Sequence, residues 1–214
     1  MYDTIIFDLD GTLLNTLEDL CNSVNYALEL NGYTCRTLEE IRCFVGNGVR
    51  KLIERALPEG VGEAEFNKIF MDFKEHYKIH CNDLTGPYEG IMELLEELHS
   101  RGYKMGIASN KMRPAVLALN DLYFKGFIQG AAGVDENITP KPEAQMVNMM
   151  LEELGSVRKK TLYVGDSQVD VETARNAGLD MVTVLWGFRT KEELLASGAK
   201  EFIEHPMELL KYLN

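Results

Sequence analysis

Two carboxylates separated by one residue give the clearest chemical signal in the chain, in the segment Asp8-Leu9-Asp10-Gly11-Thr12. Residues two apart on a strand face the same way, so Asp8 and Asp10 can point toward one spot at the end of the preceding apolar run. Gly11 permits a tight turn and lets its backbone N–H approach an anion closely. A plain polar turn would use the same residue types. Because fewer than roughly one in a hundred such chains would contain this pattern by chance, we interpret it as part of a functional site.

A second acidic pair follows another short apolar run, in Gly165-Asp166-Ser167-Gln168-Val169-Asp170. Asp166 would lie at the end of a strand over 161–164. Asp170 would lie one turn later, at the start of a helix that Gly178 ends. An aspartate at a helix start often serves only as a cap, and this alternative is stronger for Asp170 than for Asp166.

Two further polar signals lie after a predicted strand and before a predicted helix, respectively. Ser109-Asn110-Lys111 follows the run 103–108, and a hydroxyl with backbone N–H groups between a strand and a helix can hold a phosphate. Ordinary turn residues would explain this segment equally well. Lys141 stands just before Pro142 and the helix that this proline is expected to open, where a solvated charge is the alternative.

These four signals all fall on the side of an open α/β sheet where ligands bind, beyond the carboxyl ends of the strands. If Asp8, Asp10, Asp166 and Asp170 converge, their repulsion would raise their pKa values and destabilise the fold. A hard divalent cation resolves this repulsion, and Mg2+ commonly binds through a few carboxylates, waters and a substrate phosphate. The sequence therefore predicts a site for Mg2+ and a phosphate group.

Short apolar runs alternate with amphipathic stretches to form the elements that must position these residues. Strands joined by helical crossovers build a parallel sheet covered on both faces. We therefore predict an α/β fold with a doubly wound, mostly parallel sheet. Strands are expected at 3–9, 103–108, 161–165 and 181–185, with weaker ones at 127–132 and 200–203. Helix faces with i, i+3, i+4, i+7 spacing are Ile91, Leu94, Leu95 and Leu98; Ala115, Ala118, Leu119 and Leu122; and Val147, Met150, Leu151 and Leu154.

The stretch 16–82 differs because helical spacing recurs there without a convincing strand. We therefore expect two domains, a core formed by 1–15 and 83–214 and an inserted helical domain over 16–82. An insert that leaves and re-enters the core at neighbouring points can pivot as a lid. Its apolar positions are Leu17, Leu20, Cys21, Val24 and Leu28; Val49, Leu52, Ile53, Ala56 and Leu57; and Phe66, Ile69, Phe70, Phe73 and Tyr77.

Composition limits the function classes. The 214 residues include 22 basic and 34 acidic side chains, giving a net charge of −12, so nucleic-acid binding is not expected. No apolar run approaches the length of a membrane span, and no secretory signal follows Met1, so we expect a cytoplasmic protein with no membrane partner. Four cysteines without metal-ligand spacing are expected to be reduced thiols: Cys21, Cys35, Cys43 and Cys81.

In this order, the motifs resemble those of the haloacid dehalogenase (HAD) superfamily of phosphohydrolases, over essentially the whole chain. The insert is similar to the helical C1 cap of that superfamily, and the core to its Rossmann-like domain. Gly46-Asn47-Gly48, Ser109-Asn110-Lys111 and Trp186-Gly187-Phe188 are typical of the phosphoglycolate phosphatase-like branch. Asn15, where an Asp is frequent, and Ala144, where a proline is common, depart from that pattern.

The resemblance implies a Mg2+-dependent phosphatase that acts on a small phosphorylated metabolite through an aspartyl-phosphate. Asp8 would be the nucleophile and Asp10 the acid and base. Mg2+ would be held by Asp8, the backbone carbonyl of Asp10 and Asp166, with Asp170 helping directly or through water. Ser109 and Lys141 would hold the phosphoryl oxygens, with backbone N–H groups from Leu9 to Gly11 and of Asn110 as further donors.

For the cap, the loop Gly46-Asn47-Gly48 and Arg50 could contact the rest of the substrate, with Arg50 pairing a carboxylate. The alternative is that the glycines only permit a helix start and that Arg50 is solvated. A pyrophosphatase, a sugar-phosphate phosphotransferase or mutase similar to β-phosphoglucomutase, and a non-catalytic regulatory protein also stay open. We expect a monomer or a homodimer.

Overall fold

The computed structural model describes residues 1–213, which form two compact units. The core unit comprises Met1–Leu14 and the chain from Pro87 onward, and the helical unit comprises Asn15–Gly86. The predicted insert, 16–82, lies within the helical unit. The chain crosses between the units at β2 (Leu14–Asn15) and β3 (Gly86–Pro87), which pair as a two-stranded sheet.

The core unit is built on a six-stranded sheet with the order β5-β4-β1-β6-β7-β8, and all five pairings in it are parallel. The predicted doubly wound α/β fold is therefore confirmed. The strands are β1 (Thr4–Phe7), β4 (Lys104–Met112), β5 (Gly130–Val134), β6 (Thr161–Gly165), β7 (Asp180–Val184) and β8 (Phe202–Ile203).

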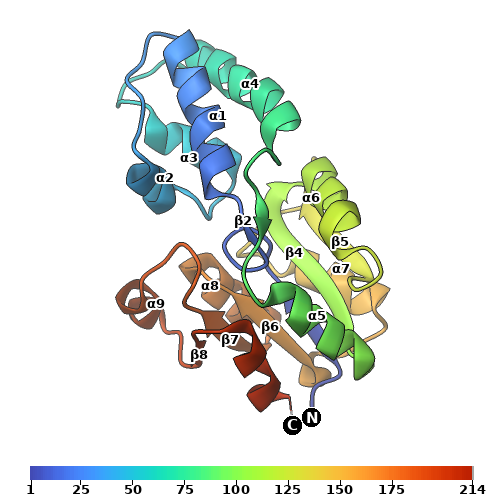
Figure 1. The fold of residues 1–214 in the computed structure, drawn as a ribbon. Helices are drawn as coiled ribbons and strands as arrows, with labels where there is room; N and C mark the ends of the chain where they lie inside the picture. The colour runs from blue at the N-terminus through green and yellow to red at the C-terminus, as the bar shows by residue number, and fades with distance from the viewer. Residues whose placement is uncertain (214) are drawn as a thin grey trace. The chain divides into compact units, whose positions relative to one another are not determined.

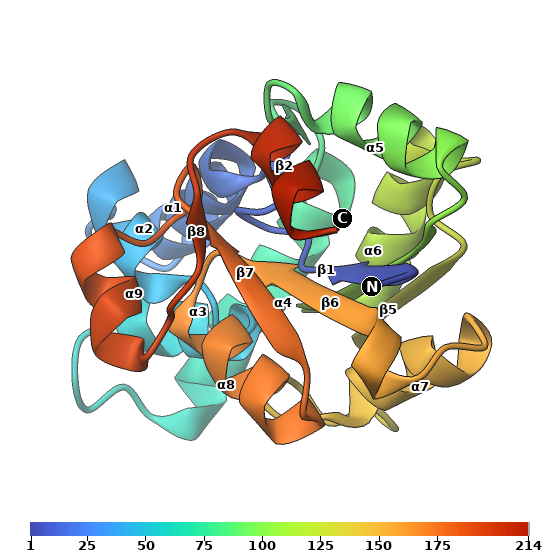
Figure 2. The same ribbon diagram turned by 90° about the horizontal axis from the view of Figure 1, so that it is seen from below.

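Both faces of this sheet are buried because alternate residues of β1 enter two different apolar clusters. Ile5 and Phe7 pack in one cluster with α5 (Ile91–Ser100) and α6 (Arg113–Leu119), whereas Ile6 packs in the other with α7 (Gln145–Glu153). Figure 2 shows α5 on one side of the sheet and α7 and α8 on the other. The remaining elements of this unit are α8 (Gln168–Ala177), α9 (Lys191–Ser197), a π-helical turn η1 (Asn120–Phe124) and the 3-10 segments η2 (Arg158–Lys160) and η3 (Pro206–Tyr212).

One predicted helix face is wrong. Leu119 is buried, but Ala118 and Leu122 are exposed, and the face that packs inward continues from Leu119 to Phe124. Ala118 lies off the α6 face formed by Val116 and Leu119. Leu122 falls in the π-helical turn η1, whose i→i+5 geometry advances the buried position to the fifth residue after Leu119. A periodicity of 3.6 residues cannot predict that change.

The helical unit contains four helices, α1 (Leu17–Leu30), α2 (Leu38–Phe44), α3 (Val49–Ala56) and α4 (Glu63–His80) (Figure 1). The apolar spacing predicts α1, α3 and α4 but not α2, which is too short to show a period. A capping box between Thr37 and Glu40 starts α2, and this signature could have identified it. No helix within residues 1–213 is long and apolar enough to cross a membrane, and all four cysteines are free thiols.

A buried carboxylate fastens the end of the helical unit to its beginning. Asp19, in the first turn of α1, is 2% exposed. It accepts hydrogen bonds from the backbone N–H of Leu84 at 3.0 Å, and from the N–H and hydroxyl of Thr85 at 2.9 and 2.7 Å. The residues that lead into and out of this unit are therefore held side by side.

Replacing Asp19 with Ala is expected to destabilise the helical unit by about 3 kcal/mol, because buried N–H donors would lose their acceptor. Urea unfolding of the variant checks this. Asp83→Ala is the matched control, since Asp83 is exposed and pairs with the half-exposed His80, and surface pairs contribute little. Equal unfolding midpoints for Asp19→Ala and the native protein would contradict the assignment.

Candidate active site at the sheet switch point

The order of the sheet places a ligand site beside β1. From β1 the chain continues to β4 and β5 on one side of it, and to β6, β7 and β8 on the other. Ligands bind at such a reversal, beyond the carboxyl ends of the strands. Asp8 directly follows β1 and Asp166 follows β6, while Ser109-Asn110-Lys111 lies near the end of β4. Most predicted site residues of the core unit therefore lie at or just after the three strands that form the switch point, whereas Lys141 lies between β5 and α7.

Three of the four predicted carboxylates converge. One oxygen atom from each of Asp8, Asp166 and Asp170 lies within 4.8 Å of the others. The three residues are 7%, 1% and 0% exposed. Asp10 is not in this cluster, and its side chain, 22% exposed, pairs with Lys111 instead.

Lys141 supplies positive charge at the centre of the cluster. Its Nζ lies 2.8 Å from Asp8 Oδ1 and 2.8 Å from Asp170 Oδ1, and 3.2 Å from the hydroxyl of Tyr163. The residue is 4% exposed, so the alternative of a solvated lysine is wrong. Pro142 does not open the next helix as expected, because α7 begins only at Gln145. Lys141 therefore belongs to the turn that precedes α7.

Asn110 holds the backbone of Lys141 with its whole side-chain amide. Its Oδ1 accepts from the Lys141 N–H at 2.7 Å, and its Nδ2 donates to the Lys141 carbonyl at 3.1 Å. Sequence reasoning expects Asn110 to offer only its backbone N–H to phosphate, so this positioning contact is missed. Two such bonds fix where the Lys141 side chain starts.

Ser109 and Lys111 lie in β4 itself, which continues to Met112 instead of ending at residue 108 as predicted. Its register against β5 shifts between Ala108 and Met112. An irregular strand of this kind re-aims side chains, and Ser109, Asn110 and Lys111 are all buried. The Ser109 hydroxyl accepts a hydrogen bond from the Lys111 N–H at 3.2 Å.

Asp166 is held by the segment after β7, a role that sequence reasoning misses. The backbone N–H of Phe188 donates to Asp166 Oδ2 at 2.8 Å, and the Thr12 hydroxyl lies 3.4 Å from Oδ1. A methyl group on Gly11 or Gly187 would collide with the Asp166 side chain. Because glycine has no side chain, the backbone at both positions can approach this carboxylate closely.

Asp170 serves both as a helix cap and as a partner of Lys141. Its Oδ2 accepts from the N–H and hydroxyl of Ser167 at 3.0 and 2.6 Å, completing a capping box at the start of α8. Its Oδ1 accepts from Lys141 and from the Tyr163 hydroxyl at 3.0 Å. The two interpretations of Asp170 are therefore compatible, and Tyr163 is a further contact that the motifs do not reveal.

Burial and mutual repulsion set the protonation of this cluster. Burial raises the pKa of Asp8 well above its ordinary value, and Asp170 and Asp166 raise it further against the opposing charge of Lys141. Burial and the Asp170 charge raise the pKa of Asp166 to about 7. Burial disfavours the ammonium of Lys141, but Asp170 and Asp8 outweigh it and hold that pKa well above its usual range. Arg189 and Lys141 oppose the shift of Asp166, but three carboxylates beside these two cations still leave negative charge in excess.

The cluster fits a divalent cation. Its oxygen donors are those that Mg2+ prefers. Asp8 Oδ1 is buried, and among residues 1–213 it meets the Lys141 ammonium at 2.8 Å without a well-aligned hydrogen bond. An added cation would satisfy this oxygen and offset the repulsion.

The residues predicted to contact substrate from the helical unit are engaged within that unit. The Arg50 guanidinium lies 4.6 Å from the centre of the Phe66 ring and 3.5 Å from Glu54. Gly48 precedes α3 with a positive φ of 81°. Arg55 donates to the Phe44 carbonyl at 2.7 Å and to Asn47 Oδ1 at 2.8 Å, which braces the loop Gly46-Asn47-Gly48. Sequence reasoning does not identify Arg55.

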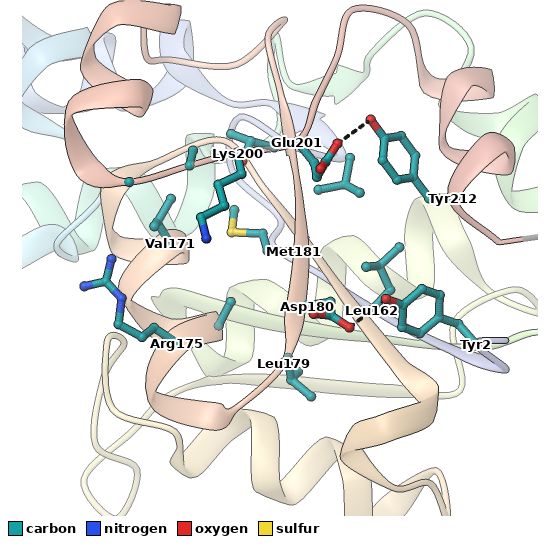
Figure 3. A pocket seen from close by; sticks show the side chains of 15 residues that line it. Tyr2, Leu162, Val171, Arg175, Leu179, Asp180, Met181, Lys200, Glu201 and Tyr212 are labelled. Carbon is teal, nitrogen blue, oxygen red and sulfur yellow. Dashed lines mark hydrogen bonds between the residues drawn. The ribbon is translucent and has the colours of Figure 1, made fainter.

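A surface pocket of about 570 Å³ also exists in the core unit, over β7 and α8, and includes none of the predicted site residues. Figure 3 shows its polar rim, where Tyr2 pairs with Asp180 at 2.7 Å and Tyr212 with Glu201 at 3.3 Å. Because Arg175 and Lys200 line the same pocket as Asp180 and Glu201, its formal charges balance, and it lacks the excess of negative charge that distinguishes the acidic cluster.

Comparison with known proteins gives consistent matches. The family model for haloacid dehalogenase-like hydrolases matches residues 5–184. Phosphoglycolate phosphatase of Mesorhizobium japonicum is 34% identical over 188 residues, 86% of this chain and 83% of its own. N-acetylmuramic acid 6-phosphate phosphatase of Pseudomonas aeruginosa is 28% identical over 212 residues, which cover 98% of this chain and 94% of its own. A crystal structure of a protein from Lactobacillus delbrueckii subsp. bulgaricus matches with a TM-score of 0.95 and 34% identity. The match covers 99% of this chain and 98% of the other.

The raised pKa of Asp166 predicts a pH-dependent stability in chelator. The contribution of this raised pKa to the free energy of unfolding is fully present below 3.8, the pKa of Asp166 in the unfolded chain. It is lost as pH rises through about 7, the pKa in the folded protein. The melting temperature in EDTA should therefore fall from about pH 5.5 to about pH 8, and Mg2+ should raise it more at the higher pH, where protons compete less. Asp166→Asn should flatten both trends. A Mg2+ effect that is larger at about pH 5.5 would contradict the charge assignment.

Gly187→Ala should weaken Mg2+ binding tenfold or more, because the added methyl group displaces Asp166 and disturbed supports of metal ligands typically lose 10–100-fold in affinity. Isothermal calorimetry measures the change. Gly62→Ala is the control, since a methyl group there meets no atom within 4 Å. Unaltered affinity in Gly187→Ala would mean that Asp166 is not a ligand.

Proposed function

The chain belongs to the haloacid dehalogenase-like hydrolase family, and from this premise we propose that it hydrolyses a small phosphomonoester with Mg2+. Metal dependence is general for the family, and the acidic cluster of this chain could hold such an ion. The observation that carries the proposal is Lys141, buried at 2.8 Å from both Asp8 and Asp170 at the switch point of the sheet. This arrangement can receive a phosphoryl group beside a carboxylate nucleophile.

In the first step, an Asp8 carboxylate oxygen attacks phosphorus and the bond from phosphorus to the leaving oxygen breaks. Asp10 donates a proton to that oxygen, so the alcohol departs neutral. Lys141 and the Ser109 hydroxyl bind the phosphoryl oxygens, with the backbone N–H groups of Leu9, Asp10 and Asn110 as further donors. The Gly11 N–H, which the sequence suggests as another donor, is engaged by the Leu14 carbonyl at 2.9 Å. Lys141 also offsets the charge of Asp8 before the attack.

In the second step, Asp10 takes a proton from water as the water oxygen bonds to phosphorus. The bond from phosphorus to Asp8 breaks, which releases phosphate and restores the carboxylate. Asp166 and Asp170 would hold Mg2+ together with Asp8 and the carbonyl of Asp10. When bound, Mg2+ neutralises phosphoryl charge and orients the group for in-line attack.

For the substrate, we propose 2-phosphoglycolate as the first candidate, supported by the name of the relative from Mesorhizobium japonicum. The unit Asn15–Gly86 would act as a cap that excludes water and large substrates. Arg50 is half-exposed, and its contact with Glu54 is a weak surface pair, so it could exchange that partner for a substrate carboxylate. The relative from Pseudomonas aeruginosa supports a sugar 6-phosphate as the second candidate.

Asp8→Asn is expected to abolish phosphate release, by at least about 1,000-fold, because an amide cannot become the esterified nucleophile. The assay measures phosphate from 2-phosphoglycolate, a sugar 6-phosphate, pyrophosphate and hexose phosphates, each with Mg2+ and with chelator. Asp121→Asn, at an exposed aspartate of the core unit, should retain full activity.

Each outcome discriminates between functions. Rearranged sugar without free phosphate would indicate a mutase, and pyrophosphate as the best substrate would indicate a pyrophosphatase. Native protein that binds Mg2+ but turns over none of these compounds would support a regulatory role. Activity that survives in a folded Asp8→Asn variant would remove Asp8 as the nucleophile.

A further inference from the structure

Lys111 is a buried cation that the proposed mechanism does not use. Its side chain is 1% exposed, and its Nζ lies 2.9 Å from Asp10 Oδ1. A buried ammonium is costly unless it is paired, so this lysine is held in place by the carboxylate that it contacts. Lys141, with its contacts to Asp8 and Asp170, already provides positive charge beside the nucleophile.

Backbone hydrogen bonds fix the loop around Asp10. They do not fix the side-chain torsions of Asp10, which depend on the partner of its carboxylate. The N–H groups of Thr12, Leu13 and Leu14 all donate to the Leu9 carbonyl, and the Gly11 N–H donates to the Leu14 carbonyl. Asp10 lies outside the acidic cluster and is partly exposed. The Lys111 ammonium, 2.9 Å from Asp10 Oδ1, is a partner placed to orient this carboxylate.

The position of Lys111 in β4 explains how it reaches Asp10. The register of β4 against β5 shifts between Ala108 and Met112, and Lys111 lies within this irregular stretch. Its backbone N–H also donates to the Ser109 hydroxyl at 3.2 Å, which leaves the hydroxyl proton available to a phosphoryl oxygen. One residue thus contacts two of the groups to which the mechanism assigns a role.

We propose that Lys111 is the positioning residue of Asp10, holding the proton-transfer carboxylate in line with the leaving oxygen and the attacking water. This inference rests on the proposed function. In the first step Asp10 gives its proton to the alkoxide as the phosphorus–oxygen bond breaks, and in the second it takes a proton from water. Lys111 itself neither gains nor loses a proton.

This role predicts a dependence on the leaving group. An alkyl phosphate such as 2-phosphoglycolate needs a proton on its leaving oxygen, whereas 2,4-dinitrophenolate leaves without one. Lys111→Met, which keeps the apolar stem and removes the charge, should lower kcat for 2-phosphoglycolate by about 100-fold or more, as is typical of lost acid–base catalysis. KM should change little, because Lys111 does not contact the substrate.

Stopped-flow measurement with 2,4-dinitrophenyl phosphate separates the two steps. Lys111→Met should release a burst of nearly one dinitrophenolate per enzyme, since attack by Asp8 is intact, followed by slow turnover because the water is poorly activated. A general loss of structure would abolish the burst. Lys159→Met, at an exposed lysine of the core unit, should behave as the native enzyme.

A double-mutant cycle with Asp10→Asn tests whether Lys111 acts only through Asp10. The double variant should then be no slower than Asp10→Asn alone. Additive losses, a raised KM with unchanged kcat, or a lost burst in folded Lys111→Met would overturn the proposal. If the native protein hydrolyses no phosphomonoester, the proposed function fails instead, so the two failures are distinguishable.

Discussion

The core unit depends on one electrostatic constraint, the burial of three carboxylates beside the ammonium of Lys141. Asp8, Asp166 and Asp170 lie within 4.8 Å of one another, and Lys141 contacts two of them. Removing charges from water is tolerated only when they are paired, and here negative charge is in excess. Burial, together with that excess, raises the pKa values of Asp8 and Asp166. A divalent cation and the protons of the medium are then alternative ways to balance it, which links metal binding, stability and pH.

The surroundings of this cluster hold it together against its own repulsion. Asn110 fixes the backbone of Lys141, Ser167 and Tyr163 hold Asp170, and the Phe188 N–H holds Asp166. These contacts come from different strands and loops. The parallel sheet brings them together because the carboxyl ends of its strands lie on the same side. Such support keeps reacting groups in a productive arrangement. Asp10 differs, since it lies outside the cluster and pairs with the ammonium of Lys111.

The sequence predicts the strands, most helices and the motif residues because these depend on local apolar runs and short spacings. The structure corrects features that depend on tertiary contacts or unusual turns. The face of α6 changes at the π-helical turn after Leu119, and β4 extends through a register shift to Met112. The helix α2 is too short to show a period. Lys111 pairs with Asp10 from 101 positions away, and Phe188 with Asp166 from 22 positions away. No local sequence pattern predicts contacts between residues so far apart in the chain.

The most direct test of this account is a crystal structure grown with Mg2+ and beryllofluoride, which mimics a phosphoryl group on a carboxylate. The account predicts one cation in contact with Asp8 and Asp166, and the fluoride complex on the Asp8 carboxylate between Lys141 and Ser109. A cation bound elsewhere, or a beryllofluoride group on a residue other than Asp8, would contradict it.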